Sequence, residues 1–323
     1  MPDKNKFQWT RLLSSSGPFL ALLALIIVCA FTSTHFLSAA NLLNISRQVS
    51  YSGIIALGMT FVIVGGGIDL SVGSLFAFAG VAAAVAMRDY SVPGTTAGLL
   101  IGLGAAMLAA LVGGALNAAL VTLGGLPPFI ATLGTYSIFR SAALYFADSG
   151  TVAVDNPTLE RIGGGALLGL PAPAFVMLAL AVLFEIVLSL TVFGRRCCAS
   201  GANERVARYS GVRVGRIRAA TYMISGLCAG IGAFLFLGRL GSIPSSDAGS
   251  LYELDAIAAV IIGGAAMSGG RGTMRGTLAG IFILGVVSTA LDFWGVSANL
   301  KGVVKGAVII SAVLMQRKRT CAN

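Results

Sequence analysis

The feature that most constrains this chain is a series of ten apolar runs, most of them long enough to cross a membrane, separated by short polar stretches. A hydrocarbon core about 30 Å thick is crossed by about 20 residues of α-helix. Inside lipid, every backbone N–H and C=O must be bonded within the chain, so such runs fold as helices. The runs lie at 18–36, 49–66, 71–87, 96–123, 128–147, 171–193, 219–238, 254–267, 274–292 and 302–315. We therefore predict an all-α polytopic membrane protein of about ten transmembrane helices, forming one domain over residues 1–323.

Composition agrees with this and excludes several classes of function. Apolar residues make up 56% of the chain and charged residues 11%, whereas soluble domains are about a quarter charged. The net charge is +10, and most of the Lys and Arg residues lie in short loops beside apolar runs, where they orient the chain in a membrane. The charge therefore does not indicate a nucleic-acid partner. The glycine-rich stretch at 269–273 lacks the lysine and spacing of a phosphate loop. We find no catalytic or metal-ligand pattern, so the sequence predicts no enzyme activity and no cofactor held by this chain.

The long polar interruption at 195–218 fixes the orientation. It holds seven arginines and one acid, Glu204. Loops rich in Lys and Arg stay in the cytoplasm, so this loop is predicted to be cytoplasmic. With six spans before it and ten in all, both chain ends are predicted to be cytoplasmic as well, as short tails over 1–17 and 316–323.

A short helix is expected inside this loop, over 201–211. Asn203 or Ser200 can serve as its N-cap, and Gly211 can end it in the left-handed conformation. Ala202, Val206 and Tyr209 then share one apolar stripe. Charge and periodicity leave two interpretations open: a docking element for another protein, or a basic loop that only sets the topology.

Four stretches resemble one family. GANERVARYSGV at 201–212, GMTFVIVGGGIDLSVGSL at 58–75, YELDAIAAVIIGG at 252–264 and GTLAG at 276–280 are similar to the permease subunits of ribose-, xylose- and arabinose-type ATP-binding-cassette importers. They appear in the family's order and span most of the chain. Arg205 and Val206 depart from the family, which usually has acidic or small residues there, so partner contacts are not carried over at these two positions.

The resemblance implies the rest of a transport system in the bacterial inner membrane. It implies a second permease subunit, ATPase subunits that bind ATP and Mg, a periplasmic sugar-binding protein, and alternating access driven by the ATPase. The residues it assigns to ATPase coupling are Gly201, Asn203, Glu204, Ala207 and Gly211. The sequence does not name the sugar, and a nucleoside or another small polar solute is the alternative cargo.

Polar residues inside the apolar runs are candidates for the translocation path, because a charge at mid-bilayer costs about 2.5–3.5 kcal/mol on insertion scales. Asp69 or Ser71 can cap the helix over 71–87, and Asp69 can instead lie at the mouth of a path or carry a proton. Asp255 can cap the segment over 254–267. Asn117 and Thr132 can line a sugar path or bond across helices.

A proton-coupled secondary transporter, using Asp69 or Glu185, is the alternative mechanism. Glu185 has no evident partner nearby in the sequence, so we expect it to pair across the bundle with Arg140 or Lys305. Such a transporter would lose uptake with the proton gradient and not with ATP.

Two glycine-rich breaks suggest an internal repeat. Val62 to Leu75 and Val260 to Leu278 both contain a β-branched apolar run, a glycine pair and a Gly-Ser-Leu or Gly-Thr-Leu restart. The second follows the run over 254–267, which is too short to cross the bilayer as a regular helix. The pattern favours two pseudo-symmetric halves of five helices each, as in many transporters.

Overall fold

The computed structural model describes the chain except for residues 1–3, 33–34, 298–299, 309 and 312–323. The predicted tail 316–323 and the end of the predicted span 302–315 therefore lie outside the described residues. Residues 300–308 are helical. The other helices and strands are α1 (Lys4–Thr32), α2 (Ala39–Val64), α3 (Val72–Tyr90), α4 (Thr96–Thr122), α5 (Pro128–Phe146), β1 (Thr151–Ala153), α6 (Pro157–Gly164), β2 (Ala166–Leu167), β3 (Leu170–Pro171), α7 (Ala172–Leu190), α8 (Val192–Ala202), α9 (Glu204–Tyr209), α10 (Val214–Leu240), β4 (Ser242–Pro244), α11 (Tyr252–Ile262) and α12 (Met274–Phe293).

The helical, membrane-spanning character predicted from the apolar runs is confirmed. Among the described residues, six helices are long and apolar enough to cross a membrane: α2, α3, α4, α7, α10 and α12. α5 has 19 residues and coincides with the predicted span over 128–147. α11 has only 11 residues, or about 16 Å at 1.5 Å per residue, as its short apolar run led us to expect. The total of ten transmembrane helices stays a prediction.

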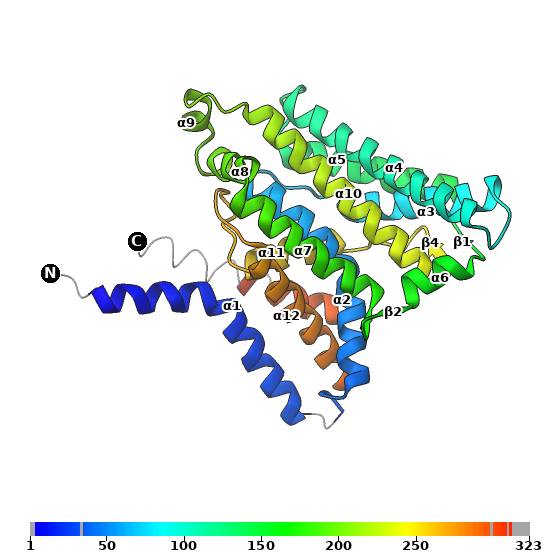
Figure 1. The fold of residues 1–323 in the computed structure, drawn as a ribbon, viewed down its shortest axis with the longest axis horizontal. Coiled ribbons are helices and arrows are strands. Elements are labelled where there is room, and N and C mark those ends of the chain that lie inside the picture. Colours follow the sequence, from blue (N-terminus) through cyan, green and yellow to red (C-terminus); the bar gives the residue numbers. More distant parts are fainter. Residues whose placement is uncertain (1–3, 33–34, 298–299, 309, 312–323) are drawn as a thin grey trace.

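The predicted tail over 1–17 is not a plain tail, because α1 already begins at Lys4. Pro18 lies inside this helix. A proline inside a helix removes one backbone hydrogen bond and kinks the helix. Figure 1 shows α1 bent, with its first part pointing away from the other helices.

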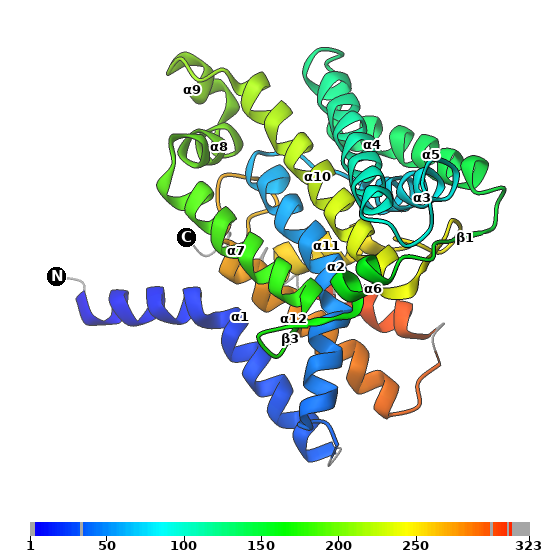
Figure 2. The ribbon, with the colours of Figure 1, turned by 45° about the vertical axis from the view of Figure 1, so that its right-hand side comes forward.

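The central element is α2, most of whose length is buried. On one side of it α10 packs against α3 and α4, and α5 packs against α3. On the other side α12 packs against α2, α11 and α1, while α7 also lies along α2. Figure 2 shows α2 passing through the middle of the molecule between these groups. α2 thus links both parts of the bundle.

At one end of the bundle, segments far apart in the sequence are joined by a short antiparallel pairing of β1 with β4, in which Val152 is opposite Ile243. The loop between α5 and α7 also contains α6. Asn156 caps α6 by accepting the N–H groups of Thr158 and Leu159, and Leu159 is buried. This outer loop is therefore packed onto the bundle.

At the other end, the two glycine-rich breaks share one backbone geometry. Gly66 after α2 and Gly264 after α11 both have positive φ, 82° and 94°. In each copy this glycine's N–H donates to the carbonyl three residues before it, and the next N–H donates to the carbonyl five residues before that N–H. This is the Schellman ending of a helix. The matched loops join α2 to α3 and α11 to α12. If the chain were two halves of five helices, the counterpart of the α2–α3 loop would be the segment 241–251. The shared geometry instead matches the α2–α3 loop with the α11–α12 loop, so it supports a different division of the chain.

Candidate functional site

The basic loop predicted at 195–218 folds into two short helices, α8 and α9. They meet at Asn203, whose φ of −158° is extended and ends α8. The Asn203 side chain accepts the Val206 N–H at 3.0 Å, so the predicted N-cap is confirmed there and not at Ser200. Gly211 has φ +77°, as predicted. The structure differs from the expected single helix over 201–211, because the cap at Asn203 breaks the chain into α8 and α9.

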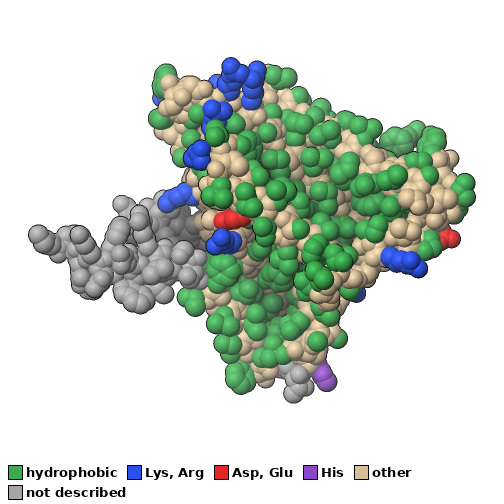
Figure 3. Space-filling view, in the orientation of Figure 1, with side chains coloured by type: hydrophobic (Ala, Val, Ile, Leu, Met, Phe, Trp, Pro, Cys, Tyr) green, Lys and Arg blue, Asp and Glu red, His purple; other side chains and the backbone are tan. Residues whose placement is uncertain are grey.

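α9 exposes two large apolar side chains beside its exposed arginines, Arg205 and Arg208. Ala207 is buried, whereas Val206 is 57% and Tyr209 86% exposed. The predicted stripe of Ala202, Val206 and Tyr209 therefore does not face the bundle, and Ala207 fills the inward position. Figure 3 shows Lys and Arg side chains gathered at this end over an otherwise largely apolar surface. We call the end that carries α8 and α9 the coupling end.

Glu204 fixes α9 to the bundle. Its carboxylate accepts Arg208 Nη2 at 2.7 Å and Arg218 Nη2, from α10, at 2.8 Å. These hydrogen bonds, from Arg208 first and Arg218 second, hold the pKa of Glu204 below its usual value. A cavity of about 350 Å³ beside this cluster lies between α9, α10 and the turn from α4 to α5. Glu204 thus holds the helix in place from within its own chain.

Gly201 lies at a junction of three backbones. A Cβ placed on it would lie 2.6 Å from the backbone N of Gly270, and closer still to the carbonyl oxygen of Val64. The Gly270 N–H donates to that same Val64 oxygen at 2.8 Å. Gly66 and Gly269 approach Gly201 at similarly short range. This glycine junction, formed by Gly66, Gly201, Gly269 and Gly270, joins α8 to the loops that follow α2 and α11.

The sequence signal for this junction was the glycine-rich stretch at 269–273. It does not match a phosphate loop, and the structure gives its glycines another use. Gly269 and Gly270 have φ of +84° and +83°, a region that side chains with a Cβ rarely enter. Close backbone packing and positive φ together require glycine here.

Asp69 is the centre of a buried polar cluster. Its Oδ1 accepts the Ser71 N–H at 3.0 Å and the Ser71 hydroxyl at 2.7 Å. The Ser225 hydroxyl, from α10, donates to Oδ2 at 3.2 Å, and the Asn117 amide of α4 lies 3.4 Å from Oδ1. Asp69 and Ser71 are both fully buried. The carboxylate therefore bonds only to neutral donors and ties the start of α3 to α4 and α10.

The prediction that the side chain of Asp69 or Ser71 caps α3 is wrong. No side chain caps the first free N–H groups of α3. Asp69 instead accepts the N–H and the hydroxyl of Ser71 itself, and its Oδ1 also lies 3.4 Å from the Asn117 amide nitrogen. The expectation that Asp69 or Ser71 caps the helix is corrected to a cross-helix cluster.

Asn117 and Thr132 extend this cluster toward α5. The Asn117 amide donates to the Ser71 hydroxyl at 2.7 Å, and its oxygen accepts from Thr135 at 2.6 Å. The Thr132 hydroxyl donates to the Pro128 carbonyl within its own helix. All three side chains are buried. Asn117 therefore bonds across helices to Ser71 and Thr135, whereas the Thr132 hydroxyl bonds within α5.

Asp255 and Glu185 have partners other than those expected. α11 begins at Tyr252, so Asp255 lies within its first turn, and its carboxylate accepts Lys305 Nζ at 2.9 Å. Glu185 accepts the Met274 N–H at the start of α12 at 2.9 Å and lies 3.7 Å from Arg275. The predictions that Asp255 caps a helix and that Glu185 pairs with Arg140 or Lys305 are therefore wrong. The packing of the helices places Lys305 beside Asp255 and Arg275 beside Glu185.

Comparisons with known proteins agree on one kind of molecule. The profile of a family described as branched-chain amino acid transport system / permease component matches residues 41–313. The ribose import permease protein RbsC of Bacillus subtilis (strain 168) is 40% identical, with 98% of this chain and 97% of the relative covered. The RbsC protein of Haemophilus influenzae is 35% identical, covering 97% and 96%. The L-arabinose transport system permease protein AraH of Escherichia coli (strain K12) is 32% identical, covering 99% and 95%.

Proposed function

The chain belongs to the family of permease subunits of ATP-binding-cassette sugar importers, and from this we propose that it carries a monosaccharide across the bacterial inner membrane by alternating access. A permease subunit of this kind is a transport component and not itself an enzyme. In the proposal ATP and Mg are bound by a separate ATPase subunit, and a periplasmic binding protein delivers the sugar. A second permease subunit, identical or closely related, completes the membrane part.

The observation that carries the proposal is the form of α9. It presents Val206 and Tyr209 outward on a helix held by the Asn203 cap and by the bond from Glu204 to Arg218. Large apolar side chains exposed together on a fixed support are typical of a protein contact. We assign this surface to contact with the ATPase. In the proposal, Asn203 and Glu204 serve coupling by supporting α9.

The glycine junction supports the mechanical step of the proposal. An ATPase that moves α8 and α9 pushes on Gly201. This glycine lies against Val64 at the end of α2 and against Gly270 in the α11–α12 loop. Tightly packed backbones transmit displacement because they have no void to close. The bundle then changes between inward and outward states when each state makes different contacts with the ATPase.

The proposed orientation places the coupling end in the cytoplasm. The seven arginines of 195–218 lie there, as the positive-inside tendency requires. The end with β1, β4 and α6 then faces the periplasm and is the side offered to a binding protein. Both chain ends are cytoplasmic in this arrangement, and no nucleic-acid partner is invoked.

The structure gives less support to a proton-coupled transporter. Asp69 is enclosed by four hydrogen-bond contacts from Ser71, Ser225 and Asn117, with no exposed face from which to exchange a proton. Glu185 lies at the coupling end, bonded to the start of α12. A nucleoside or another small polar solute stays the alternative cargo within the same transport mechanism.

The test is co-purification of the tagged chain with its partners from native membranes, followed by ATP-dependent ribose uptake in liposomes. We expect a stoichiometric ATPase in the parental sample and its loss in Tyr209→Ala. Tyr90→Ala is the matched control, because Tyr90 is 76% exposed at the opposite end. Uptake that needs a proton gradient and no ATPase would overturn the proposal. ATPase binding unchanged by Tyr209→Ala would overturn the role of α9.

A further inference from the structure

The segment 245–251, between β4 and α11, is irregular backbone that runs alongside a membrane-spanning helix. Ile243 packs against Gly80 in the middle of α3, where a Cβ would meet its side chain at 2.9 Å. Gly249 packs against Gly73, in the first turn of α3. The segment therefore descends along about two turns of α3, or about 10 Å. Non-helical backbone at this depth is tolerated only inside protein or beside water.

Arg140 of α5 satisfies the carbonyl groups of this segment. Its Nη1 donates to the backbone oxygens of Ser245 at 2.9 Å, Ser246 at 3.1 Å and Ala248 at 3.0 Å. Arg140 lies about 9 Å inside the end of α5, counted at 1.5 Å per residue. A charge at that depth is costly unless it has such partners. These bonds fix the segment against α5 and give the Arg140 charge its partners.

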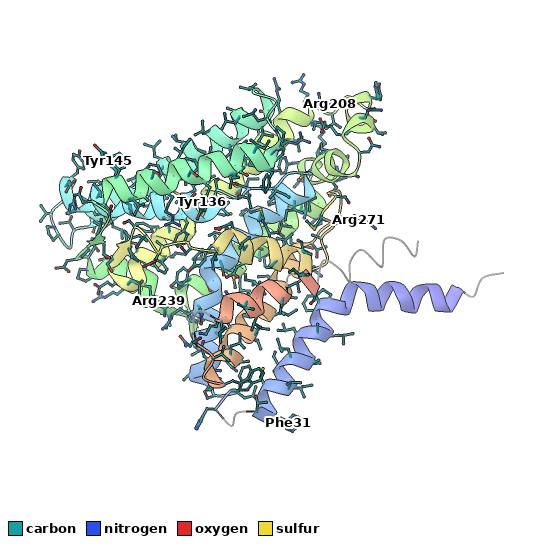
Figure 4. All side chains as sticks on the ribbon, turned by 180° about the vertical axis from the view of Figure 1, so that it is seen from behind. Phe31, Tyr136, Tyr145, Arg208, Arg239 and Arg271 are labelled. Carbon is teal, nitrogen blue, oxygen red and sulfur yellow. The ribbon has the colours of Figure 1, made fainter. Side chains whose placement is uncertain are left out.

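Five polar side chains of α5 and of the 245–251 segment are exposed near the contact made by Arg140. They are Ser137 and Ser141 of α5, and Ser246, Asp247 and Ser250 of the segment. We call these five residues the polar strip. Ser137 lies one turn from Arg140, and Arg140 bonds to the Ser246 carbonyl, so both parts of the strip lie beside Arg140. Figure 4 views the molecule from behind, with Tyr136 of α5 near its middle.

The polar strip contrasts with the exposed surfaces of α4 and α7, although α5 also exposes Ile138, at 56%, beside Ser137. α4 and α7 expose Leu108 at 64% and Val182 at 63%, side chains suited to lipid. Exposed hydroxyl groups and a carboxylate are poorly suited to lipid, because acyl chains offer them no hydrogen-bonding partner. The exposed strip must therefore meet water or another polar surface.

We propose that the polar strip is a wall of the translocation path, and that an uncharged polyhydroxylated solute bonds to its serine hydroxyls and to Asp247 as it crosses. The inference rests on the proposed function and adds the surface that recognises the solute. A hydroxyl both donates and accepts, so it matches a sugar hydroxyl in either sense. Asp247 adds acceptors that bond charge-assisted to sugar hydroxyls. Ser137, Ser141, Ser246 and Ser250 are the residues that set specificity along this wall.

The experiment uses the full transporter with partner subunits, in membranes, with Cys198 and Cys321 replaced by serine. Cys29, Cys197 and Cys228 are buried and stay in place. Single variants Ser137→Cys, Ser141→Cys, Ser246→Cys and Ser250→Cys are treated with a charged trimethylammonium methanethiosulfonate, which reacts with thiolates and hence with thiols in water. Leu108→Cys and Val182→Cys are the matched controls.

We expect the strip variants to react at least about tenfold faster than the controls, since thiolates form in water and not in lipid. Their ATP-dependent ribose uptake should fall on labelling, and added ribose should slow the labelling. Strip positions as unreactive as Leu108→Cys, or labelled without loss of uptake, would overturn the inference and leave the proposed function intact. Absence of ATP-dependent uptake in the unlabelled parental transporter would instead refute the proposed function.

Discussion

Replacing Gly201 by alanine tests whether the glycine junction holds the coupling end together. The added methyl would lie 2.6 Å from Gly270 N, so ordinary van der Waals contact at 3.4 Å requires a shift of at least about 0.8 Å there, and more at the Val64 oxygen. Both obstacles are backbone atoms, which cannot rotate aside as a side chain can. Overpacking of this kind costs about 1–3 kcal/mol.

A second cost comes from the bond between the Gly270 N–H and the Val64 oxygen, since the methyl would press on both atoms. Its loss adds about 0.5–1.5 kcal/mol. The better helix propensity of alanine returns at most about 1 kcal/mol, and less at Gly201, which lies in the last turn of α8. The net effect of Gly201→Ala is therefore destabilisation by about 0.5–4.5 kcal/mol.

The assay measures the unfolding midpoint of the purified transporter and its ATP-dependent ribose uptake. We expect Gly201→Ala to lower the midpoint by several degrees and to reduce uptake per folded molecule. Gly104→Ala is the control, because Gly104 lies inside α4 with nothing within 4 Å of an added Cβ. It should be neutral or slightly stabilising. A Gly201→Ala transporter that matches the parental one in both measurements would refute the reasoning.

Two further substitutions test the supporting contacts. Glu204→Gln should cost less than about 1 kcal/mol at pH 7, because the carboxylate is partly exposed. Since the pKa of Glu204 is lowered in the folded state, the carboxylate stabilises the fold fully above its unfolded pKa of about 4.3, and that contribution is lost as the pH falls through the folded value. Unfolding midpoints of the two proteins should therefore converge below pH 4, and a gap that persists there would contradict the assignment. Asp69→Ala should lower the yield of folded protein by leaving buried donors unpaired, at about 1–3 kcal/mol for each. Asp69→Asn, which keeps an acceptor, should fold and retain ATP-driven uptake; folded protein without uptake would revive the proton-carrier hypothesis.

Local chemistry predicted well wherever neighbours in the sequence decide the structure. Apolar runs of about 20 residues became helices, because lipid-exposed backbone has no other way to bond. Asn203 capped a helix and Gly211 took positive φ, since both depend on atoms within a few residues. The glycine-rich breaks after α2 and α11 were also visible in advance.

Partners of charged and polar groups could not be predicted in the same way. Asp69 meets Ser225 across 156 residues, and Arg140 meets Ser245 across 105. Which of several charges Glu185 or Asp255 reaches depends on how helices pack, and nothing near them in the sequence specifies this. The path candidates Asp69, Asn117 and Thr132 therefore stay predictions, because polar residues inside spanning helices serve equally as links between helices.

The sequence by itself therefore determined that the chain folds into helices of membrane-spanning length, and where two short capped breaks occur. Each of these follows from transfer free energy or from bonds within one turn. Only the tertiary structure decided that Gly201 closes a junction of three backbones, that Asp69 is enclosed, and that Arg140 meets the carbonyl groups of the 245–251 segment. Those outcomes depend on the packing of segments distant in the chain, and packing is a property of the whole bundle.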